Sequence, residues 1–427
     1  YHKNSDLQII EKAYNYADEK HSGQIRKSGK PYFTHPIRVA NIVADLGLDP
    51  QSICAALLHD VVEDTPVTND QIKERYGEEV AKIVDIVTKK PDDPGSKQVA
   101  VYRRIINSAK YGVSAIFLKF ADRLHNMRTL NSMSSEKQIK IASETDHFYA
   151  PLANRFGLYQ VKTEMEDLTF KYRNPIEYSN LEIALSTERK AEWQMLNVFM
   201  EQIASILKEE GIEARTEIRY RNPYSIWRKM QRRGVNEPRL VDGKQYIRII
   251  FPNSDSISEK DMALRIYSAL TSRINERPHS VTNYITTPKD NGYQSFHVHL
   301  LSNTGMWEEI HISSDEMIRS SQLGCASKRV QSNVHEWLSR LHHIINEITE
   351  DTNDIEFMNR ITSTFYNDNI SVFTPKGKTI ALPKGATALD FAFEIPTEVG
   401  RTAATAIING RLKPLDTELG RGDCVEI

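Results

Sequence analysis

Apolar residues at three- and four-residue spacing dominate the first 176 positions and predict helices. The first periodic segment contains Leu7, Ile10, Ala13, Tyr14 and Ala17. The next runs from His35 to Leu46 and stops at Gly47, a residue type that often follows the end of a helix. The pattern continues over 51–64 and 112–130, whereas 89–98 is a polar Pro/Gly loop and Pro175 marks the end of the unit. We expect an all-α domain over residues 1–176.

The pattern then changes to alternating strands and helices. We expect a linker helix over 177–195 and a further helix over 190–210. Strand-like runs follow at 213–220, 246–251, 296–301 and 307–312. Helical segments alternate with them around 224–233, 258–276 and 329–349. This order predicts an α+β domain over 196–350.

A third region begins near Ile370. Its runs ISVFT and KTIAL flank the turn PKGK, which indicates a β-hairpin. A helix over ALDFAFEI and two more short strands follow. We expect a small β-grasp domain over 365–427, so the chain is a multidomain protein.

Composition excludes several classes of protein. Lys plus Arg number 55 and Asp plus Glu 57, a balance that gives no bulk attraction to nucleic acid or to anionic membranes. With 40% hydrophobic and 26% charged residues, the chain is typical of folded globular proteins rather than disordered ones. No stretch is long and apolar enough for a transmembrane helix, so we expect no membrane contact. Three distant cysteines without a CxxC pair exclude a disulfide framework, and a cytoplasmic location is expected.

Two histidines and two aspartates form the strongest chemical signal. His59 and Asp60 are adjacent in AALLHDVVEDT, His35 lies upstream in YFTHP and Asp122 downstream in KFADRLHN. Imidazoles and carboxylates are good ligands for a divalent transition metal. A lone His-Asp pair is more often an ordinary surface or capping pair. Four such residues on helices rich in apolar residues favour one ion in a bundle core.

Further polar residues repeat at helical spacing beside these candidate ligands. Glu63 and Asp64 follow His59 and Asp60 by four residues, so each pair shares a helix face. There they can orient an attacking water or accept its proton. By themselves, they could equally be a solvated face. Asn126 and Thr129 extend a similar stripe from Asp122.

The segments RKSGKPYFTHP, AALLHDVVEDT, LKFADRLHNMRTL and YAPLANRFGL resemble the hydrolase domain of the RelA/SpoT homologues. That domain is an HD-type metal-dependent phosphohydrolase. The resemblance implies a Mn²⁺-dependent enzyme of the stringent response that removes the 3′-pyrophosphate from ppGpp and pppGpp, leaving GDP or GTP. The donor set alone also suits iron or zinc. Asn154 replaces the family's histidine, and we expect little effect because that position is no ligand.

The resemblance also assigns roles to individual residues. The metal ligands are His35, His59, Asp60 and Asp122. The acidic pair that activates the attacking water is Glu63 and Asp64. The substrate contacts are Arg26, Lys27, Asn126 and Thr129. Basic side chains such as Arg26 and Lys27 can meet phosphates or stack on guanine; without the metal set nearby, a solubilising basic loop would be the better interpretation.

Residues 196–350 resemble the family's nucleotidyltransferase-like synthetase domain, which transfers pyrophosphate from ATP to the 3′-hydroxyl of GDP or GTP. NYITTPKDNGYQSFHVHL resembles its acceptor motif, where Tyr293 could stack on guanine and Lys289 could meet a phosphate. RNPYSIWRKM resembles the segment that carries basic residues for ATP phosphates. The corresponding positions are Arg219, Arg221 and Ser225. Glu309 in WEEIHI matches the glutamate of the family's EVQIRT motif.

Several parts of this second site are missing. The family's magnesium-binding Asp falls on Gly243, with Asp242 one residue away. The RFKD-type motif becomes Ser280–Asn283, and the Arg-Thr of EVQIRT becomes Ser313-Ser314. Phosphoryl transfer needs charge neutralisation and in-line positioning. We therefore expect weak or no synthesis, no secure Mg²⁺ site, and either regulatory binding of GDP, GTP or ATP or a domain that binds nothing.

The third region, ISVFTPKGKTIALPKGATALDFAFEI, resembles the TGS domain of long family members, which implies contact with the ribosome, tRNA or a protein partner. Long members continue past this domain, and the chain begins at Tyr1 rather than Met, so we expect a piece of a longer protein. Three functions compete: a (p)ppGpp hydrolase, a bifunctional synthetase and hydrolase, and an RNA-associated sensor with vestigial catalysis. The complete ligand set argues against the sensor, and the gaps at Gly243 and Ser280–Asn283 argue against the bifunctional enzyme.

Overall fold

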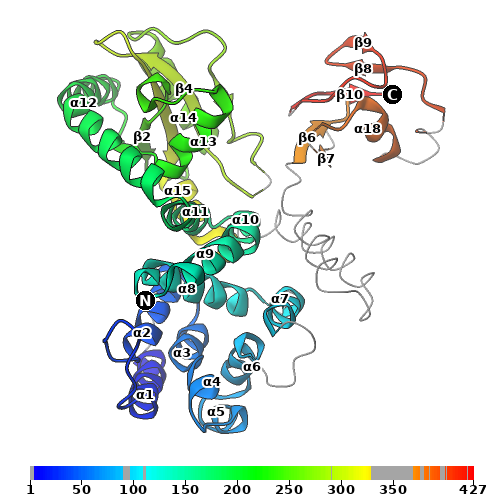
Figure 1. Cartoon of the computed structure of the whole chain (residues 1–427). Helices are drawn as coiled ribbons and strands as arrows, with labels where there is room; N and C mark the ends of the chain where they lie inside the picture. The colour runs from blue at the N-terminus through cyan, green and yellow to red at the C-terminus, as the bar shows by residue number, and fades with distance from the viewer. Residues whose placement is uncertain are drawn as a thin grey trace.

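The computed structural model contains the three predicted kinds of domain (Figure 1). It describes residues 4–89, 97–108, 112–289 and 291–327, and in the last region residues 369–375, 379–383, 385–394, 400, 402–420 and 422–427. The fold class predicted from the sequence is confirmed. None of the described helices combines the length and the apolar character that crossing a membrane requires. The expected helix over 329–349 lies outside the described residues.

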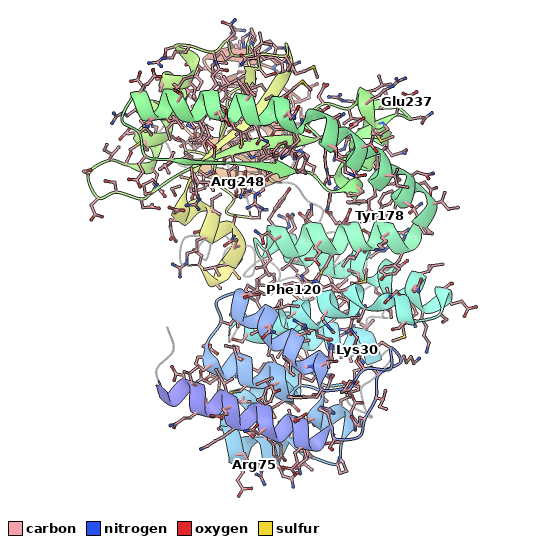
Figure 2. All side chains as sticks on the ribbon, turned by 90° about the vertical axis from the view of Figure 1, so that its left-hand side faces the viewer. Lys30, Arg75, Phe120, Tyr178, Glu237 and Arg248 are labelled. Atoms are coloured by element: carbon pink, nitrogen blue, oxygen red, sulfur yellow. The ribbon has the colours of Figure 1, made fainter. Side chains whose placement is uncertain are left out.

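The first domain is helical. Its helices are α1 (Asn4–Lys20), α2 (Thr34–Asp45), α3 (Pro50–Leu58), α4 (Val61–Asp64), α5 (Asn69–Tyr76), α6 (Glu78–Val87), α7 (Lys97–Ser108), α8 (Ser114–Arg128), α9 (Ser135–Glu144), α10 (Ala150–Arg155) and α11 (Tyr159–Arg173). Helix α8 lies at the centre of this domain, and most of its residues are buried. Phe117 and Phe120 of α8 pack into the domain core (Figure 2). The core therefore surrounds the helix that carries Asp122.

The segment 51–64 was expected to be one helix, and the structure corrects this. Helix α3 ends at Leu58 and α4 begins at Val61, with His59 and Asp60 in a turn between them. Both turn residues keep right-handed helical backbone angles, and the Asp64 amide still donates to the Asp60 carbonyl at 2.8 Å. The break is thus small, and the four-residue spacing that links Asp60 to Asp64 survives it.

A single long helix connects the first two domains. Helix α12 covers Pro175–Glu209, so the two expected helices over 177–195 and 190–210 are one continuous element (Figure 2). Pro175 opens this helix, a position where its missing N–H costs nothing. Tyr178 and Leu185 pack beside α11 and α13 (Pro223–Arg233), whereas Phe199 and Ile203 join the core of the sheet. Where the domains begin and end along α12 stays a prediction.

The second domain is a five-stranded sheet with flanking helices. Its strands are β1 (Arg215–Tyr220), β2 (Gln245–Phe251), β3 (Thr282–Asn283), β4 (Phe296–Leu301) and β5 (Trp307–Ser314), in the order β1-β2-β5-β4-β3. Strands β2 and β5 pair in parallel, and the other pairs in this sheet are antiparallel. Helices α14 (Glu259–Thr271) and α15 (Asp315–Leu323) complete the described part. The four longer strands match the expected runs, and α14 is shorter than expected.

The C-terminal module is built as a β-grasp. It contains β6 (Asn369–Phe373), β7 (Thr379–Pro383), α18 (Ala388–Glu394), β8 (Ala406–Ile408), β9 (Arg411–Lys413) and β10 (Val425–Glu426). The predicted hairpin is the antiparallel pair β6–β7, although most of its PKGK turn lies outside the described residues. A parallel bridge from Phe373 to Cys424 connects it to the sheet β10-β8-β9. The described part of this module has three short strands after the helix, one more than expected.

Candidate metal centre and nucleotide pocket

The four predicted metal ligands converge in the core of the helical domain. His35 comes from the first turn of α2, His59 and Asp60 from the turn after α3, and Asp122 from α8. His35 Nε2 lies 3.5 Å from Asp60 Oδ2 and 3.3 Å from Asp122 Oδ1, and His59 Nε2 lies 3.1 Å from Asp60 Oδ1. The ligand atoms of His35, His59 and Asp60 all lie within 4.8 Å of one another. The structure thus brings the predicted set together.

The ring of His59 is oriented as a metal ligand. Its Nδ1 lies 2.8 Å from the carbonyl oxygen of Ala56, which can only accept, so Nδ1 carries the proton. The lone pair of Nε2 then faces Asp60. This buried Nε2 has no hydrogen-bond partner among the described residues. A buried polar atom normally has a partner, and a metal ion would satisfy this one.

His35 is oriented by a histidine that sequence reasoning missed. Its Nδ1 lies 2.7 Å from Nδ1 of buried His125. Burial and the neighbouring His35 lower the pKa of His125 to about 3, so that ring is neutral at physiological pH. If His35 donates from Nδ1, its Nε2 lone pair faces Asp60 and Asp122. The spacing of three from Asp122 to His125 places both on α8, but only the fold shows the contact.

Asp122 is held by two neighbours on its own helix. Lys119 Nζ donates to Asp122 Oδ2 at 2.9 Å, and Asn126 Nδ2 donates to Oδ1 at 2.6 Å. Burial opposes ionisation, but the Lys119 ammonium and the His35 ring outweigh it and hold the pKa of Asp122 well below its usual range. Asp122 is therefore a carboxylate, as a ligand must be. Lys119 was also missed, although it lies in the same segment as Asp122.

The two residues of the predicted acidic pair, Glu63 and Asp64, contact different partners. The hydroxyl of Tyr32 donates to Asp64 Oδ2 at 2.6 Å and lies 3.0 Å from Asp60 Oδ2, so Tyr32 connects Asp64 to the predicted ligand Asp60. Glu63 instead forms an ion pair with Lys89 at 3.2 Å. Both side chains retain exposure to solvent. Their roles in water activation stay a prediction.

A basic cavity of about 300 Å³ adjoins Asp122. It is lined by the four predicted substrate contacts, Arg26, Lys27, Asn126 and Thr129, together with Lys89, Lys119 and Arg123. Arg26 Nη2 donates to Asn126 Oδ1 at 3.4 Å, so Asn126 connects a cation of the cavity to the predicted ligand Asp122. The cluster of cations suits a substrate that carries several phosphates.

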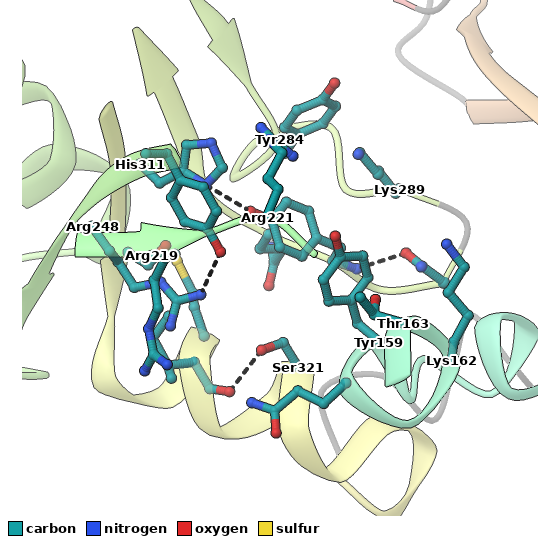
Figure 3. A pocket seen from close by; sticks show the side chains of 18 of the residues that line it. Tyr159, Lys162, Thr163, Arg219, Arg221, Arg248, Tyr284, Lys289, His311 and Ser321 are labelled. Atoms are coloured by element: carbon teal, nitrogen blue, oxygen red, sulfur yellow. Dashed lines mark hydrogen bonds between the residues drawn. The ribbon is translucent and has the colours of Figure 1, made fainter. Parts of the chain in front are cut away.

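A larger cavity of about 970 Å³ lies between the helical domain and the sheet (Figure 3). Tyr159, Lys162 and Thr163 of α11 form one side. Arg248 and His311 of the sheet and Arg221, directly after β1, form the other. Five predicted nucleotide-site residues line it: Arg219, Arg221, Lys289, Tyr293 and Glu309. Ser225 does not; it lies in the first turn of α13, where its amide donates to the capping side chain of Asn222. The cavity is rich in cations and aromatic rings, both of which suit a nucleotide.

Cations occupy the place of the missing carboxylate beside Glu309. Arg221 pairs with Glu309 at 2.7 Å, and both Arg221 Nε and Lys229 Nζ donate to the Gly243 carbonyl at 2.9 Å. Gly243 has a φ of +63°, and a Cβ there would lie 3.0 Å from Lys229 Nζ. Asp242 is exposed and pairs with Arg233 at 3.1 Å. Asp242 therefore does not supply the missing ligand. Lys229 lines an adjoining cavity together with Gly243 and Glu309, and it was not predicted from the sequence.

The helical domain contributes directly to this nucleotide pocket. Asn291 Nδ2 donates to Asn154 Oδ1 at 3.2 Å, which joins the acceptor-motif loop to α10. The Tyr159 ring of α11 lies 6.4 Å from the Tyr293 ring, measured between centroids. Lys289 Nζ lies over the Tyr293 ring at 5.1 Å. Neither Asn154 nor Tyr159 was predicted as part of this site, because both lie far away in the sequence.

Comparisons with known proteins divide the chain in the same way. Residues 13–159 match the family described as HD domain, residues 218–333 the region found in RelA / SpoT proteins, and residues 370–427 the TGS domain. A solved structure, described as a metazoan ortholog of SpoT that hydrolyzes ppGpp, is 31% identical and covers 31% of this chain and 72% of its own, with a TM-score of 0.26.

Two curated relatives span nearly the whole chain. A GTP pyrophosphokinase of Myxococcus xanthus is 37% identical and covers 100% of this chain and 57% of its own length. A guanosine-3′,5′-bis(diphosphate) 3′-pyrophosphohydrolase of Aquifex aeolicus is 39% identical and covers 98% of this chain and 60% of its own. The chain thus spans less than two thirds of either relative. From its HD, synthetase-like and TGS domains and these full-span similarities, the chain belongs to the family of long RelA/SpoT homologues.

Proposed function

We propose that the helical domain is a manganese-dependent (p)ppGpp 3′-pyrophosphohydrolase that converts ppGpp to GDP, and pppGpp to GTP, with release of pyrophosphate. The observation that supports this most is the buried His59 Nε2, which has no hydrogen-bond partner among the described residues and lies 3.1 Å from Asp60 Oδ1. The activity named for the relative from Aquifex aeolicus is the same reaction.

The donor set fits a divalent transition-metal ion. His35, His59, Asp60 and Asp122 would hold it with two imidazole nitrogens and two carboxylates. When bound, such an ion supplies Lewis acidity toward phosphoryl oxygens and water. We propose Mn²⁺ because carboxylates favour it, while the imidazoles also admit zinc or iron.

The chain's own side chains would bind the substrate, take a proton from the attacking water and supply one to the 3′ oxygen. In hydrolysis a water oxygen bonds to phosphorus while the bond to the 3′ oxygen breaks, so water loses a proton and the 3′ oxygen gains one. We assign this transfer to Glu63 and Asp64, and Tyr32 holds Asp64 in place. Arg26 and Lys27 of the basic cavity would bind the phosphates.

The direct test is hydrolysis of labelled ppGpp by metal-stripped protein. Adding Mn²⁺ should restore release of labelled pyrophosphate. The rates of release with Zn²⁺ and with Fe²⁺, each added separately, show whether another ion supports the reaction better. The same protein should be incubated with ATP, GDP and Mg²⁺ to measure synthesis. Hydrolysis that proceeds equally without metal would contradict the proposal, and absence of hydrolysis with every ion would favour the RNA-associated sensor.

We further propose that the second domain binds GDP or GTP without efficient transfer from ATP. Tyr293 and Lys289 remain in the pocket, which supports binding. Arg221 donates to Glu309 Oε2, and both Arg221 and Lys229 donate to the Gly243 carbonyl, so these oxygens are already bonded where a magnesium ion would need oxygen ligands. The combination supports a pseudo-synthetase over a bifunctional enzyme.

Nucleotide binding in this pocket would tune the hydrolase if it favours one arrangement of the two domains. One supporting contact joins the two sites: Arg128, next to Thr129 of the basic cavity, donates twice to Glu164, which lines the nucleotide pocket, at 2.6 and 2.8 Å. The contact of the TGS domain with RNA or protein and the cytoplasmic location remain predictions from the sequence.

A further inference from the structure

A second cluster of metal-ligand side chains lies on one face of the sheet, outside the helical domain. Alternate residues of a strand share a face, so Glu309 and His311 of β5 point the same way. His297 of β4 lies directly opposite His311 in the antiparallel register, which brings their Cβ atoms to about 5 Å. One ligand atom from each of the three residues lies within 4.8 Å of the others.

The chemistry of this cluster favours a transition metal over magnesium. Two imidazoles and one carboxylate form a donor set typical of catalytic zinc sites, whereas Mg²⁺ prefers oxygen ligands and retained waters. A neutral imidazole keeps a lone pair on one of its two ring nitrogens, so each of the two histidines can offer one ligand atom to a metal.

We propose that His297, Glu309 and His311 form a second metal site, which takes an ion of the Zn²⁺ class. Glu309 matches the glutamate of the EVQIRT motif, so His311 stands where that motif has glutamine. A glutamine amide is a far weaker ligand for zinc than an imidazole. The histidine thus gives this part of the pocket a strong zinc ligand where the motif has a weak one. This inference does not depend on the hydrolase function proposed for the helical domain.

The contacts of the cluster define what binding requires. His311 Nε2 lies 2.7 Å from Glu309 Oε1, and His297 Nδ1 lies 4.0 Å from the same oxygen. The two rings are stacked with centroids 3.6 Å apart and planes 8° apart. An ion cannot lie in two parallel ring planes, so one ring must tilt. Arg221 bonds the other carboxylate oxygen, Oε2, and can keep that bond while Oε1 binds the ion.

The site would present an open coordination position to the nucleotide pocket. All three residues line the cavity of about 970 Å³, as do Arg248 and Lys289. With three protein ligands, a zinc-class ion keeps a fourth position for an exogenous group. The surrounding cations favour an anionic occupant such as a phosphate oxygen.

Cobalt(II), which reports its coordination by visible absorption, provides the test. The first centre is removed by Asp60→Ala, so that bound Co²⁺ whose binding also depends on His311 can be assigned to the second site. This protein should bind about one equivalent of Co²⁺ with the absorption of a four-coordinate nitrogen and oxygen site. Adding His311→Gln to this protein should lower its affinity for Co²⁺ at least about tenfold. Removing a residue that only supports a metal ligand already costs about that much, and His311 is proposed as a ligand itself. The control His147→Gln alters an exposed histidine of the helical domain and should leave binding unchanged.

A second measurement covers the case in which Asp60→Ala fails to fold. Metal content of the otherwise unaltered chain, measured by mass spectrometry after loading with Co²⁺, should fall by about one equivalent on His311→Gln. If the proposed hydrolase centre binds no metal, Asp60→Ala leaves the metal content of the chain unchanged. His311→Gln still lowers that content by one ion, so the two proposals can fail separately. Unchanged metal content in His311→Gln, or no Co²⁺ binding by folded Asp60→Ala protein, would overturn the second site.

Discussion

Asn291 donates a hydrogen bond from Nδ2 to Oδ1 of Asn154 at 3.2 Å, across 137 residues of sequence. The bond joins the loop of the acceptor motif to α10 of the helical domain. From the sequence, asparagine at position 154 is expected to have little effect, because the residue is no predicted metal ligand. Its effect is expected in the other site, since it holds the loop that carries Lys289 and Tyr293.

Asn154→Ala should therefore weaken binding of GDP to the nucleotide pocket. One neutral hydrogen bond contributes about 1 kcal/mol, which corresponds to roughly a fivefold rise in Kd. Isothermal titration calorimetry with GDP measures the change. Asn15→Ala, on an exposed position of α1, is the matched control and should bind like the unaltered chain. Equal affinities in both variants would show that the Asn154 contact does not order the loop.

Asp60→Ala should abolish both the bound metal ion of the helical domain and ppGpp hydrolysis. Asp60 approaches both histidines, so its loss removes a ligand and leaves His59 Nε2 without its nearest charged neighbour. Metal analysis and release of labelled pyrophosphate measure the two losses. The control Asp18→Ala removes an exposed carboxylate of α1. Full activity of Asp60→Ala with the metal retained would refute the ligand assignment.

The cluster of candidate ligands could be predicted from the sequence, but some of the groups that contact it could not. His59 and Asp60 are adjacent, and their segment is long and specific. The role of His125 depends on where α2 and α8 pack, because its partner His35 lies on α2. Lys119 lies three residues before Asp122 on α8, a spacing from which the pair could have been predicted. The contact of Asn154 with Asn291 has no local signal at all, since it forms only when two domains meet. The continuity of α12 was also missed, because the expected boundary between the first two domains, at 195–196, falls inside a helix that extends from one domain into the other.

Glu63→Gln combined with Asp64→Asn should keep the metal ion and lose turnover. Neither carboxylate is part of the ligand set, and the amides preserve the size of the side chains. Loss of general acid–base catalysis typically lowers the rate by about 10²–10⁴-fold. Single-turnover hydrolysis and metal analysis of the same preparation test this. If the variants instead lose metal and fold, Glu63 and Asp64 are structural residues.

Lys229 should titrate well below an ordinary lysine. Burial and the neighbouring Arg221 lower the pKa of Lys229 to about 8. A lysine with a depressed pKa in the folded protein loses its proton on folding between about pH 8 and 10.4, so its destabilising effect is greatest below pH 8 and fades as the pH rises. Competitive labelling with an amine reagent, followed across pH by mass spectrometry, should give a midpoint near 8. Arg221→Met should raise that midpoint, and a midpoint near 10.4 in the unaltered chain would contradict the account.

Tyr293→Ala should weaken binding of GDP and GTP to the second domain, whereas Tyr293→Phe should largely preserve it. Stacking of a base on an aromatic ring contributes about 1–3 kcal/mol, so the alanine variant should lose roughly 5- to 150-fold in affinity. Phenylalanine keeps the ring and loses only the hydroxyl, which lies 3.1 Å from His297 Nε2. Calorimetry with both nucleotides measures the difference. Equal binding by the alanine variant would place the base elsewhere in the pocket.

The purified chain should form little or no ppGpp from ATP and GDP with Mg²⁺, and Gly243→Asp should not restore synthesis. A carboxylate at this position would return the family's missing group, but Gly243 has a φ of +63° and a Cβ there would lie 3.2 Å from Glu309 Oε2. The new carboxylate would also meet Lys229 and Arg221, which already neutralise Glu309 and compete with a magnesium ion. Thin-layer separation of labelled products measures synthesis. Robust synthesis by the unaltered chain would refute the pseudo-synthetase and establish a bifunctional enzyme. Recovery of synthesis in Gly243→Asp would show that the missing carboxylate, rather than the surrounding cations, decides whether the site can transfer pyrophosphate.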